Sequence, residues 1–235
     1  MTDGSFRHKL FENDPSHRTD ALLTQRNKEE SEMNGIRVAV IGTGIIGRTL
    51  AARLAEAGHT ATIGTRNPGR DGLEDARHTG ARVTSIEEAI DSSEAVVWAI
   101  NGAAMVEAIP AYGRQLADKV VIDATNNIGA PTMNSLDLIA EHAPTAPAYR
   151  AFNSLGWENF EDPCYGEETG DLLYSGPSGP SQAVAEALIA ATGLRPIRVG
   201  DNDKAKIVDD FVTLWFTLAF EAGFGRNLGF KILTR

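Results

Sequence analysis

The feature that most constrains the fold of this chain is a cluster of glycines between an apolar run and a helical pattern. Residues 38–41 read Val-Ala-Val-Ile, glycines follow at positions 42, 44 and 47, and apolar residues then recur at helical spacing up to residue 57. This order of strand, glycine turn and helix is the context in which the pattern G-x-G-x-x-G carries structural meaning. It predicts the first strand–helix unit of a parallel α/β sheet.

The rest of the chain continues this alternation. Strands are expected at residues 36–41, 60–63, 81–84, 95–100, 120–122, 148–152, 172–174 and 196–199, and helices at 45–57, 86–90, 105–116, 136–141, 181–191 and 203–222. Strands that are apolar throughout and separated by helices are typical of a parallel sheet covered on both faces. We therefore expect an α/β fold: a Rossmann-type doubly wound, mostly parallel sheet with a small C-terminal helical lobe.

Composition narrows the classes of partner. The chain carries 22 Lys and Arg against 32 Asp and Glu, a net charge of −10. This balance disfavours nucleic acid and anionic membrane surfaces, and no apolar run approaches the ~18 residues that a membrane span needs. The single cysteine, Cys164, excludes an intrachain disulfide and fits a reducing cytoplasm, where we expect the protein to work.

The glycine turn itself predicts a dinucleotide site. Gly42 permits the sharp turn, Gly44 lets a pyrophosphate approach the backbone, and Gly47 lets helix and strand pack closely. Thr43, Ile45 and Ile46 complete the loop, and the helix amino end offers free N–H groups to the phosphates. The alternative is a tight turn that binds nothing.

The end of the next strand indicates which nucleotide. An Asp or Glu there would bind the 2′-hydroxyl of NAD, but this strand ends in Thr65, Arg66 and Asn67, with Arg70 close behind. A guanidinium attracts a 2′-phosphate that a carboxylate would repel. We therefore expect NADP(H) rather than NAD, the alternative being that both arginines are solvated loop charges.

Loops after the later strands should line the rest of the cleft, because ligands of such sheets lie beyond the carboxyl ends of the strands. The candidate residues in these loops are Ala99, Ile100, Asn101, Thr125, Asn126 and Asn127. Asn is also a common turn former. Two alternatives stay open for Asp123: its carboxylate acts as a base, or it stabilises the turn by hydrogen bonding.

The chain shows no histidine placed for proton transfer to a carbonyl and no spacing of metal ligands, so no catalytic residue and no metal are expected. Hydride transfer between two cofactor rings would need little more than alignment. The alternatives are an imine or 3-hydroxy-acid reductase, with Lys204 or Lys206 as proton donor or as a solvated charge, and a sensor that binds NADPH without chemistry.

Longer segments carry a family resemblance. "VAVIGTGIIGRTLAARLAEAGH", "IGTRNPGR" and the C-terminal "LRPIRVGDNDKAKIVDDFVTLWFTLAFEAGFGRNLGFKIL" resemble the NADP oxidoreductases that use the deazaflavin coenzyme F420. "VIDATNN" and "RAFNSLGW" are similar to the cytoplasmic NADPH-binding domain of membrane ferric reductases, which pass hydride to a flavin. Residues 134–170 look closer to this second branch, so F420 and a flavin (FMN or FAD) both stay open as hydride partner.

The resemblance implies roles for particular residues. It implies that Thr65, Arg66 and Asn67 hold the NADP phosphate and that Ala151, Phe152 and Asn153 lie near the nicotinamide. It also implies a homodimer, in keeping with the strongly apolar C-terminal helix, which is either core or dimer interface.

These expectations divide the chain into three parts. Residues 1–34 are an N-terminal extension, expected to be disordered because it holds few large apolar residues, and either Met33 or Met1 is compatible with the start of the protein. Residues 35–150 are an NADP-binding Rossmann domain, and residues 151–235 are a small C-terminal substrate and dimerisation lobe.

Overall fold

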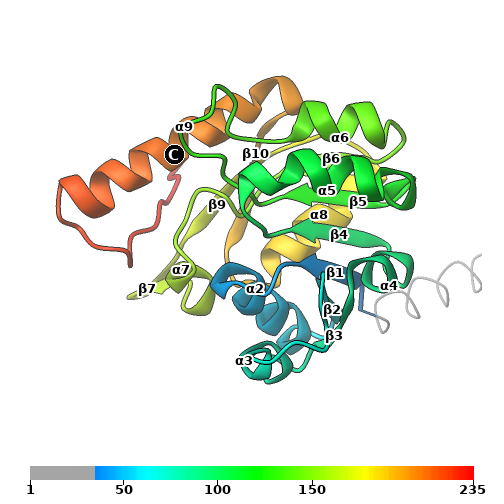
Figure 1. Cartoon of the computed structure of the whole chain (residues 1–235). Coiled ribbons are helices and arrows are strands. Elements are labelled where there is room, and N and C mark those ends of the chain that lie inside the picture. The colour runs from blue at the N-terminus through cyan, green and yellow to red at the C-terminus, as the bar shows by residue number, and fades with distance from the viewer. Residues whose placement is uncertain (1–34) are drawn as a thin grey trace, which may run out of the picture. The chain divides into compact units, whose positions relative to one another are not determined.

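The glycine turn joins a strand to a helix as the sequence predicts. In the computed structural model, which describes residues 35–235, β1 (Arg37–Ile41) leads through the turn into α2 (Ile45–Glu56) (Figure 1). Helix α2 ends before Gly58, whose φ of 89° only glycine adopts readily. The extension expected at residues 1–34 lies outside the described residues.

Six strands run parallel in the order of a doubly wound sheet. They are β1, β2 (Thr60–Thr65), β3 (Arg82–Ser85), β4 (Ala95–Trp98), β5 (Val120–Asp123) and β6 (Ala148–Arg150). Their order β3-β2-β1-β4-β5-β6 is that of the Rossmann fold, with the strand order reversing between β1 and β4. The predicted fold class is therefore confirmed.

Two further strands extend the sheet beyond β6. Strand β9 (Asp171–Ser175) is antiparallel to β6, and β10 (Arg195–Gly200) is parallel to β9. A separate hairpin pairs β7 (Cys164–Tyr165) with β8 (Glu168–Thr169). Residues 36–235 form one compact unit, so the expected C-terminal lobe shares the sheet of the Rossmann part. Its role in substrate binding or dimerisation stays a prediction.

Helices cover both faces of the sheet, as Figure 1 shows. The helices are α2, α3 (Glu74–Arg77), α4 (Ile86–Asp91), α5 (Met105–Tyr112), α6 (Leu136–His142), α7 (Glu158–Glu161), α8 (Pro180–Ala190) and α9 (Ala205–Phe216). Val38 and Val40 of β1 pack in one apolar cluster with α2 and α8, whereas Ala39 and Ile41 pack in another with α4, α5 and α6. This alternation is why β1 reads as apolar throughout.

Two expected helices change their hydrogen-bonding pattern before they end. The helix expected at 105–116 is α5 followed by a 3₁₀ helix (Gly113–Leu116), and Pro110 within α5 lacks the N–H that an α-helical bond needs. The helix expected at 203–222 begins with a 3₁₀ turn, continues as α9 and ends in a π-helical turn (Thr217–Glu221).

Candidate functional site

The three glycines of the turn differ in the space around them. A Cβ on Gly42 would lie 2.3 Å from the carbonyl oxygen of Ala99, and one on Gly47 would lie 2.3 Å from the carbonyl oxygen of Gly42. A Cβ on Gly44 would have nothing within 4 Å. The first and third glycines therefore serve close backbone packing, and the second leaves open space at the amino end of α2, where a phosphate group would be attracted.

A cavity of about 790 Å³ opens beside this turn, at the carboxyl ends of β1 and β2. Its lining includes eight of the predicted cofactor residues: Gly42, Thr43, Thr65, Arg66, Asn67, Arg70, Ile100 and Asn101. The volume falls in the range of small-molecule and cofactor sites. Asn101 also caps the 3₁₀ helix Gly102–Ala104, because its Oδ1 accepts the N–H of Ala103 at 2.9 Å.

Sequence reasoning missed the wall that α5 contributes. Ala108, Ala111, Glu107 and Tyr112 of α5 line the cavity, together with Ala104 at the end of the preceding 3₁₀ helix. The three alanines recur at helical spacing in the segment that follows β4, so a stripe of small residues facing the switch point was the available signal.

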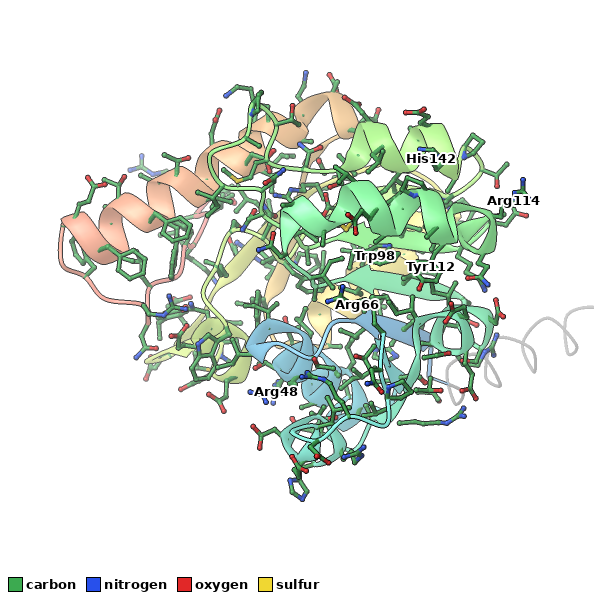
Figure 2. All side chains as sticks on the ribbon, viewed as in Figure 1. Arg48, Arg66, Trp98, Tyr112, Arg114 and His142 are labelled. Carbon is green, nitrogen blue, oxygen red and sulfur yellow. The ribbon has the colours of Figure 1, made fainter. Side chains whose placement is uncertain are left out.

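The cavity lining carries two positive charges, Arg66 and Arg70. Arg66 is exposed and forms no ion pair with another described residue, and Arg70 donates from Nη2 to the Thr43 hydroxyl at 3.1 Å. Burial raises the pKa of the Tyr112 hydroxyl, nearby Glu87 raises it further, and the charge of Arg66 acts in the opposite direction. Figure 2 labels Arg66 and Tyr112, which come from the end of β2 and from α5. An anionic group here would meet Arg66 without breaking an existing ion pair.

The loops after β4 and β5 are in direct backbone contact. A Cβ on Gly102 would lie 2.5 Å from the amide nitrogen of Asn127. Because Ala99 in turn contacts Gly42, the predicted loops form a continuous strip from the glycine turn to the end of β5. Eleven predicted residues lie outside the cavity lining and keep their cofactor roles as predictions: Gly44, Ile45, Ile46, Gly47, Ala99, Thr125, Asn126, Asn127, Ala151, Phe152 and Asn153.

Asp123 ties the turn after β5. Its carboxylate is fully buried and accepts the amide N–H and the hydroxyl of Thr125, at 2.9 and 2.7 Å, and the amide N–H of Ser135 at 2.6 Å. These three hydrogen bonds, together with the Arg150 guanidinium 3.4 Å from Oδ1, hold the carboxylate in the turn and give it a structural role there.

Arg150, which sequence reasoning also missed, holds the same loop from the neighbouring strand. Its guanidinium is fully buried and donates to Asp209 of α9 at 2.8 Å, to the side-chain oxygen of Asn126 at 2.7 Å and to the carbonyl oxygens of Asp123 and Thr125. An arginine that ends an apolar strand was the only signal in the sequence, and its partner Asp209 lies 59 positions along the chain.

The segment after β6 combines burial with unusual backbone geometry. Ala151, Phe152 and Asn153 are all buried, and Phe152 has a φ of 62°, in the left-handed region that bulky residues avoid. Strained residues of this kind are concentrated at functional sites.

The two lysines considered as proton donors lie just before α9 and in its first turn. Strand β10 runs antiparallel to β6, and Asn202, just after β10, donates to the carbonyl oxygen of Ala148 at the amino end of β6. Lys204 and Lys206 follow, exposed and paired with Asp203 and Asp210, each at 2.6 Å. Both ammonium groups are therefore held in surface ion pairs.

Strand order, glycine geometry and the adjoining cavity define a nucleotide-binding protein of the Rossmann class. Residues 37–127, from β1 to the loop after β5, match the family model described as NADP oxidoreductase, coenzyme F420-dependent. A structure from Arthrobacter sp. FB24, provisionally described as an F420-dependent NADP reductase, is 26% identical, covers 85% of this chain and 100% of its own, and superposes with a TM-score of 0.74.

Two curated relatives extend the comparison. Metalloreductase STEAP3 of Rattus norvegicus is 26% identical over 179 residues, which is 74% of this chain and 36% of the relative. Glycerol-3-phosphate dehydrogenase [NAD(P)+] of Chlorobium phaeobacteroides is 26% identical over 219 residues, which is 85% of this chain and 65% of the relative. The chain thus spans about a third and about two thirds of the lengths of these proteins.

Together these comparisons confirm the resemblance to the F420-dependent NADP oxidoreductases and to the ferric reductases. They also support the prediction of an NADP-dependent oxidoreductase activity. None of the helices between residues 35 and 235 has the length and apolar character needed to cross a bilayer.

Proposed function

We propose that this protein is an oxidoreductase that exchanges hydride between NADP(H) and a deazaflavin (coenzyme F420) or flavin (FMN or FAD) partner. The observation that carries the proposal is Arg66, an exposed guanidinium without an ion-pair partner among the described residues, on the cavity at the end of β2. An NAD-specific site would present a carboxylate at this place.

The residues present fit NADP(H). Gly44 leaves open space before the amino end of α2 for the pyrophosphate, while Arg66 and Arg70 bring positive charge to the 2′-phosphate. The nicotinamide half of NADP(H) would then lie along the loops from Ala99 to Asn127 and reach residues 151–153.

The chemistry asks these residues to bind and to orient. When bound, NADPH would supply a hydride, a hydrogen nucleus with two electrons, to the acceptor ring, which would also take up one proton from solvent, leaving NADP⁺ and the two-electron-reduced acceptor. Both reactants are preformed rings, so the protein contributes alignment and exclusion of solvent rather than a proton-transferring side chain. This is consistent with an Asp123 carboxylate that is fully buried and hydrogen-bonded within its own turn.

The position of the lysines weakens the case for an imine or 3-hydroxy-acid reductase in which Lys204 or Lys206 donates a proton. Both are exposed and held in ion pairs with surface carboxylates, so replacing either with alanine should leave the rate of NADPH oxidation within about twofold. A sensor that binds NADPH without chemistry is the other alternative, and turnover distinguishes it.

The test is anaerobic oxidation of NADPH, followed by absorbance, with F420, FMN and FAD supplied separately. We expect turnover with at least one acceptor and a much lower rate with NADH. Tight NADPH binding with no oxidation by any acceptor would favour the sensor, and failure to bind either nucleotide would contradict the proposal.

We also propose that two copies pair through the end of α9 and the π-helical turn that follows it. Leu214, Phe216 and Phe220 are 42%, 36% and 53% exposed, and the rings of Phe216 and Phe220 stack 5.6 Å apart. In Figure 1 this end of the helix, orange to red, reaches beyond the sheet. Exposed aromatic side chains that lie together, as at Phe216 and Phe220, are typical of an interaction surface.

A further inference from the structure

A buried polar cluster lies behind the loops that carry the proposed nicotinamide end. We call Asp123, Asn126, Arg150, Asn153 and Asp209 the Arg150 cluster. Arg150 and Asp123 are fully buried, and Asn153 and Asp209 are 4% and 7% exposed. Burying ions has a large desolvation cost, and replacing a buried ion pair with apolar residues is often neutral or stabilising. Stability alone therefore explains such a cluster poorly.

Asp209 is the member that joins the cluster to α9. One carboxylate oxygen, Oδ1, accepts Arg150 Nε at 2.8 Å and faces Asn153 Nδ2 at 3.5 Å. The other, Oδ2, accepts the side-chain amide of Asn134 at 2.7 Å. A single side chain of α9 thus holds the loop after β5, the end of β6 and the segment that follows β6.

The negative charge of Asp209 favours one orientation of the Asn153 amide. The carboxylate attracts Nδ2 and would repel Oδ1, so Oδ1 is directed away from Asp209. That oxygen is buried and has no hydrogen-bond partner among the described residues. Leaving a buried acceptor unpaired costs free energy, and the preceding Phe152 adds backbone strain at a φ of 62°.

An unpaired acceptor and a strained backbone on consecutive residues point to a ligand with an N–H donor. We propose that Asn153 Oδ1 accepts a hydrogen bond from the carboxamide of the nicotinamide, and that Asp209 is the positioning residue that orients it. This inference rests on the proposed binding of NADP(H), and it makes the geometry of the nicotinamide end depend on α9.

The test compares two nucleotides in full-length protein by calorimetry. NADP⁺ has the carboxamide N–H, whereas its 3-acetylpyridine analogue carries a methyl ketone and cannot donate. In Asn153→Ala, affinity for NADP⁺ should fall about tenfold, as expected for one hydrogen bond, while affinity for the analogue stays within about twofold. Asp209→Asn should give the same pattern.

Asp210→Asn is the matched control, because Asp210 is the next residue of α9 and pairs only with Lys206 at the surface among the described residues. It should leave both affinities unchanged. If Asp209 has a purely structural role, Asp209→Asn will instead lower the melting temperature of the protein and weaken the binding of both nucleotides equally. That result would overturn the inference. Because Asn153→Ala removes no charge, it keeps the test available if Asp209→Asn fails to fold.

The outcomes separate this inference from the proposed function. If the variants show the expected affinity pattern but no acceptor oxidises NADPH, the proposed hydride exchange is wrong and the proposed role of Asp209 in orienting Asn153 is kept. If wild-type protein turns over NADPH but the variants keep the wild-type ratio of the two affinities, the positioning role fails alone. If wild-type protein binds no NADP⁺, both fail.

Discussion

Gly44 and Gly47 allow the glycine turn to be tested one residue at a time. Gly44 has a φ of −71°, which any residue can adopt, and a Cβ there would enter open space. A Cβ on Gly47 would be pressed against the carbonyl oxygen of Gly42 at 2.3 Å. The same substitution should therefore affect ligand binding at one glycine and folding at the other.

We expect Gly44→Ala to lower the free energy of unfolding by less than about 1 kcal/mol and to weaken NADPH binding by about tenfold or more, because the methyl group enters the space proposed for the pyrophosphate. Gly47→Ala should lower the free energy of unfolding by about 1–3 kcal/mol. Denaturant unfolding and NADPH titration measure both effects. Unchanged NADPH affinity in Gly44→Ala would place the pyrophosphate elsewhere.

Some residues of the site could be predicted and others could not, for a physical reason. The glycines, Arg66 and Asn67 follow strands β1 and β2, and their positions depend on a local pattern that the sequence displays. Arg150 and Asp209 meet only because β6 and α9 pack together, 59 positions apart. A contact of that range leaves no mark in a single sequence. The left-handed backbone of Phe152 is equally invisible, because nothing in its neighbours requires it.

The secondary-structure elements show the same difference between features set by local sequence and features set by tertiary packing. Helix α4 could be placed to within a residue because Ser85 caps it, accepting the amide N–H of Glu88 at 3.2 Å. The ends of α5 and α9 could not, because the change to 3₁₀ and π geometry depends on Pro110 and on tertiary packing rather than on apolar spacing. The predicted type of each element nevertheless agrees with the structure throughout the Rossmann sheet.

The connection between α2 and β2 should make stability depend on pH. His59 Nδ1 accepts the amide N–H of Ile36 at 3.1 Å, and burial lowers the pKa of this histidine from its ordinary value of 6.5. Below that pH the unfolded chain binds more protons at His59 than the folded chain does. The stabilisation is therefore complete above pH 6.5 and is lost as the pH falls through the lowered folded-state pKa.

The check is chemical denaturation of wild-type protein and of His59→Gln from about pH 8 to about pH 5. The variant has no proton to bind at this position, so the stability advantage of the wild type should shrink as the pH falls. A difference that stays constant, or grows towards acid, would contradict the assignment.

At the scale of the whole molecule, the proposed nucleotide site lies at the carboxyl ends of the strands, and exposed aromatic side chains lie at the end of α9. If the end of α9 is a dimer interface, Phe220→Asp should convert a dimer into a monomer in sedimentation, because a carboxylate would be buried in an apolar contact. Val106→Asp on α5, where the side chain is 61% exposed, is the control and should leave the dimer intact. A monomeric wild-type protein, or a dimeric Phe220→Asp variant, would exclude this interface.

The most direct test of the account is the charge at the end of β2. Calorimetric titration should show wild-type protein binding NADPH about ten to a hundred times more tightly than NADH, the size expected for hydrogen bonds from a guanidinium to a phosphate. Arg66→Ala should bring the two affinities together, whereas Arg114→Ala, at the right edge of Figure 2, should not. Equal binding of NADH and NADPH by the wild type, unchanged in Arg66→Ala, would contradict the account.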